Sequence, residues 1–235
     1  MSIQQAMSTA APANGILSRP GTQPSARIVS ALEVLLVYAG VLLYIWRWQF
    51  SYPRLWIVFL AIMVLSHLAH GERPRDLGLT LAGLRANAEK ILPLVLAIYL
   101  MLVLYGFARH LLVLLVPGKQ SLVWFTAYLS WCAVQQYLAQ SYFHCRLMTV
   151  IENPHRRSLV VGLMFGATHI PNPVLMVVTT LAGFIFAEVF ARHRNIWPLA
   201  LAQAAGGFLI AAISPASLIR NMRVGPGYYF YRLKP

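Results

Sequence analysis

Apolar runs of near-membrane length occupy most of the chain and restrict what it can fold into. They cover residues 28–46, 53–69, 91–117, 121–149, 158–169, 174–190 and 196–213. A transmembrane helix needs about 20 mostly apolar residues. A chain with 59% hydrophobic and 11% charged residues is also too apolar for a soluble domain of 235 residues. We therefore predict an all-α fold, a polytopic membrane helix bundle with about seven transmembrane or partly re-entrant helices.

Three further segments complete the expected organisation. Residues 1–27 are rich in Ser, Ala, Pro, Gln and Gly and lack an apolar core, which predicts a disordered tail and no signal peptide. Residues 71–90 surround several leucines with charges and indicate a short amphipathic helix in the membrane interface. Residues 28–213 then form one transmembrane domain, and residues 214–235 form a basic, aromatic tail. The run 158–169 is short, so it either begins in the preceding loop or ends at an internal cavity.

Basic residues outnumber acidic ones, 19 to 6, and give a net charge of +13. They lie mainly in the tails and between apolar runs, where they meet anionic headgroups and direct topology. Membrane lipids are therefore the expected partners of these cations, and nucleic acid is not. More cations fall on the amino-terminal side of a seven-span bundle. We expect an integral protein of a bacterial inner membrane with a cytoplasmic amino terminus.

Three glutamines lie inside one of the apolar runs. Gln135, Gln136 and Gln140 belong to the run 121–149, which we expect to be a single helix. An amide without a partner in hydrocarbon costs several kcal/mol, so these side chains should face the protein interior. Gln136 and Gln140 stand one turn apart on one helix face. The expected partners at the same depth are His169, Glu188 and Gln203.

The order of these residues resembles the CAAX-protease and bacteriocin-processing (CPBP, or Abi) intramembrane peptidases over about residues 70–210. The motifs of that family are Glu-Glu-x-x-x-Arg, Phe-x-x-x-His, and His-x-x-x-Asn shortly after Trp-Pro. Phe165 and His169 match the second motif. The positions of the first motif hold Gln135, Gln136 and Gln140, and those of the third hold Gln203 and Gly207.

The resemblance implies a peptidase fold, but the substitutions remove its chemistry. Such a peptidase needs a carboxylate to deprotonate water and histidines to bind a metal or stabilise an oxyanion. Glutamine is no general base and is a poor zinc ligand. We therefore expect no metal and no cofactor. The candidate catalytic positions are Gln135, Gln136, His169, Gln203 and Glu188, and the candidate binding residues are Gln140, Phe165 and Asn172.

Each candidate also has a structural interpretation. The glutamines can be interhelical hydrogen-bond partners, and His169 can be a hydrogen-bonded core histidine that ends a helix. Glu188 can pair with Arg192, one turn further on.

Three functions remain open. The first, which we favour, is a catalytically silent CPBP-like homologue that binds a membrane protein or lipid-modified peptide in a polar intramembrane cavity. The second is an active endopeptidase with an altered site, in which Glu188 or Glu152 acts with His169. The third is a scaffold subunit of a membrane complex or a small-molecule carrier.

Overall fold

The computed structural model describes residues 24–111 and 119–230, and this part of the chain is helical with no strands. The helices in order are α1 (Pro24–Leu43), η2 (Tyr44–Trp48), α2 (Trp56–Ala69), α3 (Leu84–Ala108), α4 (Lys119–Gln136), η3 (Tyr137–His144), α5 (Cys145–Val150), α6 (Pro154–Ala167), α7 (Pro173–Arg192), α8 (Trp197–Ile213), α9 (Ala216–Ile219), η4 (Arg220–Met222) and α10 (Pro226–Phe230). The predicted all-α class is confirmed.

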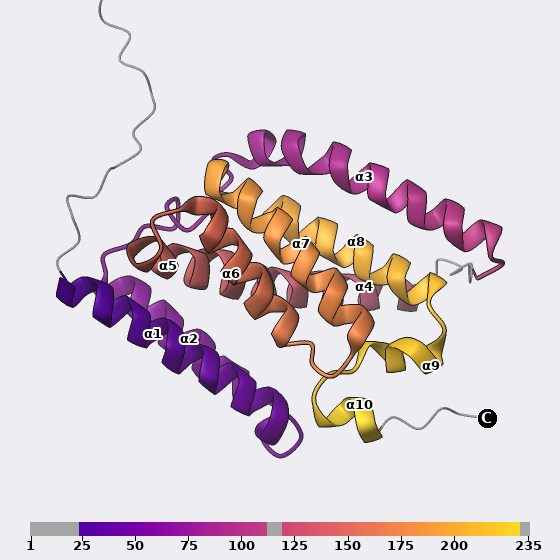
Figure 1. Cartoon of the computed structure of the whole chain (residues 1–235), viewed down its shortest axis with the longest axis horizontal. Coiled ribbons are helices and arrows are strands. Elements are labelled where there is room, and N and C mark those ends of the chain that lie inside the picture. Colours follow the sequence, from indigo (N-terminus) through magenta and orange to yellow (C-terminus); the bar gives the residue numbers. More distant parts are fainter. Residues whose placement is uncertain (1–23, 112–118, 231–235) are drawn as a thin grey trace, which may run out of the picture.

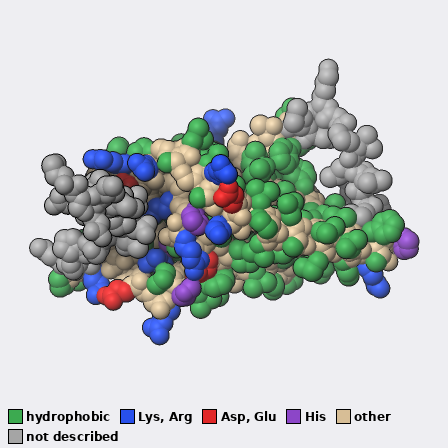
Figure 2. Space-filling view, turned by 90° about the horizontal axis from the view of Figure 1, so that it is seen from above, with side chains coloured by type: hydrophobic (Ala, Val, Ile, Leu, Met, Phe, Trp, Pro, Cys, Tyr) green, Lys and Arg blue, Asp and Glu red, His purple; other side chains and the backbone are tan. Residues whose placement is uncertain are grey.

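The long helices run side by side in alternating directions between two ends of the molecule (Figure 1). We call the end at which α1 begins the first end; it also holds the α5–α6 loop and the α7–α8 turn. The second end holds the end of α1, the α6–α7 turn and the carboxy-terminal helices. Charged side chains gather on one half of the face in Figure 2, and hydrophobic ones cover most of the rest.

The outer surface of the bundle is suited to lipid. Three described helices, covering Pro24–Trp48, Leu84–Ala108 and Pro173–Arg192, are long and apolar enough to cross a membrane. Two shorter helices, Trp56–Ala69 and Trp197–Ile213, are also apolar. Many large apolar side chains on α1, α2 and α3 are exposed, as expected where hydrocarbon replaces water. The chain is therefore a helical membrane bundle.

The glutamine-bearing run forms one continuous helix, as predicted. It passes without a break from α4 through η3 into α5, and its middle segment, Tyr137–His144, has π-helical hydrogen bonding. A π segment changes the angular position of every residue that follows it. Side chains before and after residue 137 therefore do not share one face as they would in a regular α-helix.

The short run expected at 158–169 begins earlier, in the polar loop. Asn153 caps α6 by accepting a hydrogen bond from the Arg156 backbone N–H at 3.0 Å. α6 packs closely on α7 through glycines: a Cβ on Gly162 would lie 2.7 Å from the backbone oxygen of Thr180. At 14 residues, α6 is only about 21 Å long.

The structure corrects the prediction of an amphipathic helix over 71–90. Residues 71–83 form turns, and the helix begins at Leu84. Gly78 has a φ of +70°, and a Cβ there would lie 2.7 Å from the Phe190 ring. The side-chain amide of Asn195 donates to the carbonyls of Thr80 at 2.8 Å and Ala82 at 3.1 Å. Because tertiary partners satisfy this backbone, the segment packs against the α7–α8 turn instead of forming a surface helix.

The first and third helices overlap the expected spans where the structure describes them. α1 begins at Pro24, four residues before the expected start of the first span, and the rest of the predicted amino-terminal tail lies outside the described residues. α3 ends at Ala108, and residues 112–117 of the expected third span are also outside them. Residues 216–230 form short helices that pack beneath the α6–α7 turn (Figure 1).

Candidate functional site

Three glutamine side chains from two helices meet at the centre of the bundle. The Gln136 Nε2 donates to Gln203 Oε1 at 2.7 Å, and the Gln203 Nε2 donates to Gln135 Oε1. Gln136 is fully buried, and its Oε1 has no hydrogen-bond partner among the described residues. We call these three residues the amide triad. They occupy positions where the resembling family has two glutamates and a histidine.

Gln140 does not join the amide triad. Its side chain is fully buried, and neither its Oε1 nor its Nε2 has a partner among the described residues. Gln140 lies inside the π segment, whereas Gln136 immediately precedes it. Gln136 and Gln140 are both fully buried, but no hydrogen bond of the described residues joins Gln140 to the triad.

His169 follows the end of α6, and its Nδ1 is not bonded to the amide triad. Nδ1 lies 2.8 Å from the Phe165 carbonyl oxygen and 3.2 Å from the hydroxyl oxygens of Thr168 and Thr179. The Phe165 ring contacts the imidazole edge to face, with centroids 5.1 Å apart. These contacts fit a histidine held by the α6–α7 turn. Gln135, Gln136 and Gln203 therefore converge as expected, whereas no hydrogen bond joins His169 Nδ1 to them.

Glu188 lies near the first end, far along α7 from His169. Its Oε2 is 3.0 Å from His155 Nδ1 and 3.0 Å from Arg192 Nη2, which includes the i,i+4 pair foreseen from the sequence. Fifteen residues of helix separate Pro173, beside the α6–α7 turn, from Glu188, a rise of about 22 Å. Glu152 is in the α5–α6 loop, also at the first end. Neither carboxylate is placed to share a water molecule with His169.

Asn172 is a structural residue in this geometry. It is fully buried, and its Oδ1 accepts from the Leu175 N–H at 3.2 Å to cap α7. Its Nδ2 donates to the carbonyl oxygens of Ile219 at 2.7 Å and Arg223 at 3.3 Å. The amide thereby ties the carboxy-terminal segment to the α6–α7 turn.

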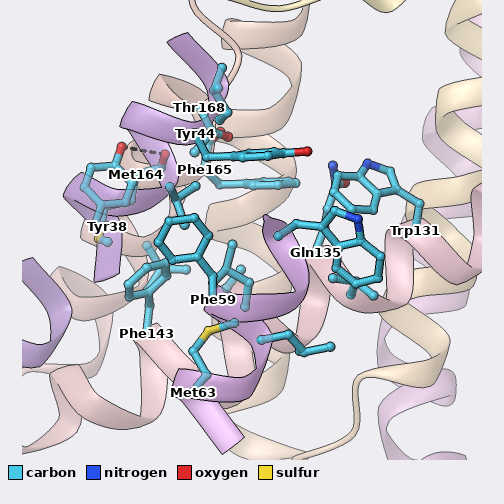
Figure 3. A pocket seen from close by; sticks show the side chains of 18 residues that line it. Tyr38, Tyr44, Phe59, Met63, Trp131, Gln135, Phe143, Met164, Phe165 and Thr168 are labelled. Atoms are coloured by element: carbon cyan, nitrogen blue, oxygen red, sulfur yellow. Dashed lines mark hydrogen bonds between the residues drawn. The ribbon is translucent and has the colours of Figure 1, made fainter. Parts of the chain in front are cut away.

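A largely apolar cavity adjoins the amide triad (Figure 3). It lies between α1, α2, α6 and the glutamine-bearing helix, and the space between its walls, including the part open to the outside, is about 860 Å³. Aromatic side chains provide much of the wall: Tyr38, Tyr44, Trp56, Phe59, Trp131, Phe143 and Phe165. Gln135 is in the wall, and its Nε2 donates to no described residue.

The cavity offers a ligand an apolar surface beside one amide. Its wall consists almost entirely of apolar side chains, so burial of an apolar group there is favourable. Gln135 is the member of the triad that lines the cavity, and its Nε2 donor can bind a carbonyl oxygen, whereas Gln136 is buried behind it. Within residues 24–111 and 119–230 no three His, Cys, Asp or Glu side chains are grouped so as to hold a metal ion.

A second polar cluster, at the first end, was not foreseen. Arg146, 3% exposed, binds Glu72 at 2.7 Å and Glu33 at 2.9 Å, and His67 Nδ1 lies 2.6 Å from Glu72. His67 is buried here, and His70 Nε2 lies 3.3 Å from Glu33 Oε2. The sequence signal for this cluster was the presence of two charged residues, Glu33 and Arg146, inside apolar runs.

One segment of the chain matches a known protein family. Residues 117–209 match the family model described as type II CAAX prenyl endopeptidase Rce1-like. This segment contains the amide triad, Phe165 and His169, so the resemblance to CPBP peptidases is confirmed there. No curated protein and no solved structure matches the chain.

Proposed function

Because residues 117–209 form an Rce1-like segment within a membrane helix bundle, we propose that the chain is a catalytically silent homologue of these peptidases. In this proposal it binds a lipid-modified peptide in the cavity and does not cleave it. The observation that carries the proposal is the amide triad, in which glutamines at the family's acid and histidine positions hydrogen-bond to one another. An amide can hold a peptide group but cannot deprotonate water.

The cavity supports a substrate-like ligand with two chemical parts. Its aromatic and aliphatic wall would accept an isoprenoid or acyl chain, for which burial is favourable. The Gln135 amide at the same wall would bind the adjoining peptide carbonyl. The sequence predicts a polar cavity, whereas most of this wall is apolar. The apolar wall suggests that specificity for a lipid group comes from shape and burial, with the glutamines orienting the peptide.

The proposal includes the membrane in which the chain lies and its orientation there. We propose a bacterial inner membrane with the first end in the cytoplasm. Arg27, Arg146, Arg156, Arg157, Arg192 and Arg194 lie at that end, which fits the positive-inside tendency. The cavity lies towards the second end, where Tyr44, Trp56 and Thr168 line it, so in this orientation a lipid-modified peptide would enter from the leaflet opposite the first end.

The proposal is tested with full-length protein in nanodiscs and a fluorescent farnesylated peptide. Anisotropy measures binding, and mass spectrometry of the same sample measures cleavage. Ala139 is 5% exposed and lines the cavity, so Ala139→Phe should fill it and weaken binding about tenfold or more. Ala61→Phe, on the exposed face of α2, is the matched control and should bind as wild type does.

Three results would contradict the proposal. Cleavage that is lost in His169→Ala would show that catalysis survives. Equal binding of the farnesylated and unmodified peptides would remove the role of the apolar wall. Unchanged affinity in Ala139→Phe, with an unchanged melting temperature, would place the ligand elsewhere.

A further inference from the structure

Two arginines at the first end, Arg157 and Arg194, contact the carboxy-terminal part of the glutamine-bearing helix. The Arg157 Nε donates to His144 Nε2 at 3.3 Å, and its Nη1 donates to the Ile151 carbonyl oxygen at 3.1 Å. The Arg194 Nη2 contacts the sulfur of Met148 at 3.1 Å. His144 and Met148 are four residues apart on one helix face, and Ile151 directly follows the end of α5. The two guanidinium groups therefore share a small region.

All hydrogen-bond acceptors of these two guanidinium groups among the described residues are neutral. Arg194 Nη1 donates to the backbone carbonyl of Asp76 at 2.8 Å, and Arg157 Nη2 donates to no described group. His144 Nε2 accepts from Arg157, so this imidazole is uncharged and supplies no compensation. Arg157 is only 7% exposed, and a buried charge without a counter-charge is costly.

Five of the six acidic side chains of the chain pair with other cations. Glu33 and Glu72 pair with Arg146, and Glu188 pairs with His155 and Arg192. Glu152 lies 3.9 Å from Arg27 and Glu89 lies 2.7 Å from Arg85. Asp76 has an exposed side chain and forms no ion pair among the described residues. Arg157 and Arg194 thus form no ion pair with a carboxylate of the described chain.

We propose that Arg157 and Arg194 form a binding site for a phosphate group, supplied by an anionic phospholipid headgroup or by a soluble phosphate. Guanidinium groups bind phosphate through paired, charge-assisted hydrogen bonds. Arg157 Nη2 provides a free donor, and Arg194 can exchange its weak sulfur contact for a phosphate oxygen. The site lies at the end of the bundle where the helix reaches its polar loop, which is the depth of a headgroup.

The test uses full-length protein in phosphatidylcholine nanodiscs, with three additions compared by melting temperature. These are phosphatidylglycerol in the bilayer, inorganic phosphate in the buffer, and chloride at the same ionic strength. Wild type should be stabilised by phosphatidylglycerol, by inorganic phosphate, or by both, relative to chloride. Stabilisation by phosphatidylglycerol alone identifies a lipid headgroup as the source, and stabilisation by inorganic phosphate identifies a soluble one.

The variants assign the effect to these residues. Arg194→Gln should reduce the apparent affinity for the stabilising anion about tenfold or more. Arg156→Gln, an exposed neighbour, should respond as wild type does. In chloride, Arg194→Gln should melt no lower than wild type, because it removes repulsion between two cations. No stabilisation of wild type by either phosphate source, or an unchanged response of Arg194→Gln, would overturn the site. If Arg157→Gln does not fold, Arg194→Gln alone decides.

Discussion

The amide triad allows a sharp test through its central member. Gln203 accepts from Gln136 and donates to Gln135, so Gln203→Met leaves a donor and an acceptor without partners. A buried polar group that loses its partner costs about 1–3 kcal/mol. Gln136 is fully buried and should bear the full cost, whereas Gln135 borders the cavity. We expect Gln203→Met to lower the free energy of unfolding by roughly 2–4 kcal/mol.

The triple variant should behave differently from the sum of its parts. When Gln135, Gln136 and Gln203 are all replaced by methionine, no polar group is left unpaired and the volumes are similar. Its stability should return to within about 1 kcal/mol of wild type. Binding of the farnesylated peptide should still be lost, because the amides that orient the peptide are absent.

Unfolding by SDS in mixed micelles, followed by tryptophan fluorescence, measures these free energies. Gln140→Met is the matched control, since it also exchanges a buried glutamine but breaks no hydrogen bond of the described chain. If the triple variant is destabilised by the sum of the three single changes, the glutamines are not mutual partners. The arrangement of the site would then be wrong.

Four other outcomes follow from single features of the structure. Gln140→Met should raise the unfolding free energy by about 1–3 kcal/mol in the same assay, because it removes a buried amide without a partner. Burial raises the pKa of Glu72, but bonds from His67 and Arg146 outweigh it and lower the pKa to about 2. The resulting stabilisation is complete above the usual value of 4.5 and is lost as the pH falls towards 2, and Glu72→Gln should remove this part of the pH dependence of unfolding. Gly162→Ala should destabilise by roughly 1–3 kcal/mol in SDS titration, because its Cβ would meet the α7 backbone. Deletion of residues 215–235 should lower the melting temperature, because the buried Asn172 amide loses its acceptors.

Much of the fold follows from apolar run length. The helices α7 and α8 begin and end within two residues of the predicted runs, because Asn172 and Pro173 start one and Trp197-Pro198 starts the other. The segment 71–83 was not predictable in this way. Its alternating leucines and charges fit a surface helix, and only the side-chain amide of Asn195, more than a hundred residues away, explains why it folds as turns.

Part of the candidate site was also predicted from the sequence. The high cost of amides in hydrocarbon correctly brought Gln135, Gln136 and Gln203 together. The sequence did not predict the π segment that contains Gln140, or the lack of a hydrogen-bond partner for its amide among the described residues. The sequence suggested that Glu188 could act together with His169. In the structure most of α7 lies between them, and Glu188 pairs with His155 instead.

The Asn172 contacts also have a consequence for the order of synthesis. The α6–α7 turn is made of residues 168–172, but the carbonyls that bind the Asn172 amide belong to Ile219 and Arg223. At a ribosomal rate of about 5–20 residues per second, roughly 3–10 s pass between synthesis of this turn and synthesis of its partners. During that time the hairpin carries a polar amide with no acceptor of its own. Residues 219–223 therefore complete a structure that was synthesised earlier, and a chain halted before residue 219 would retain an open turn beside the cavity.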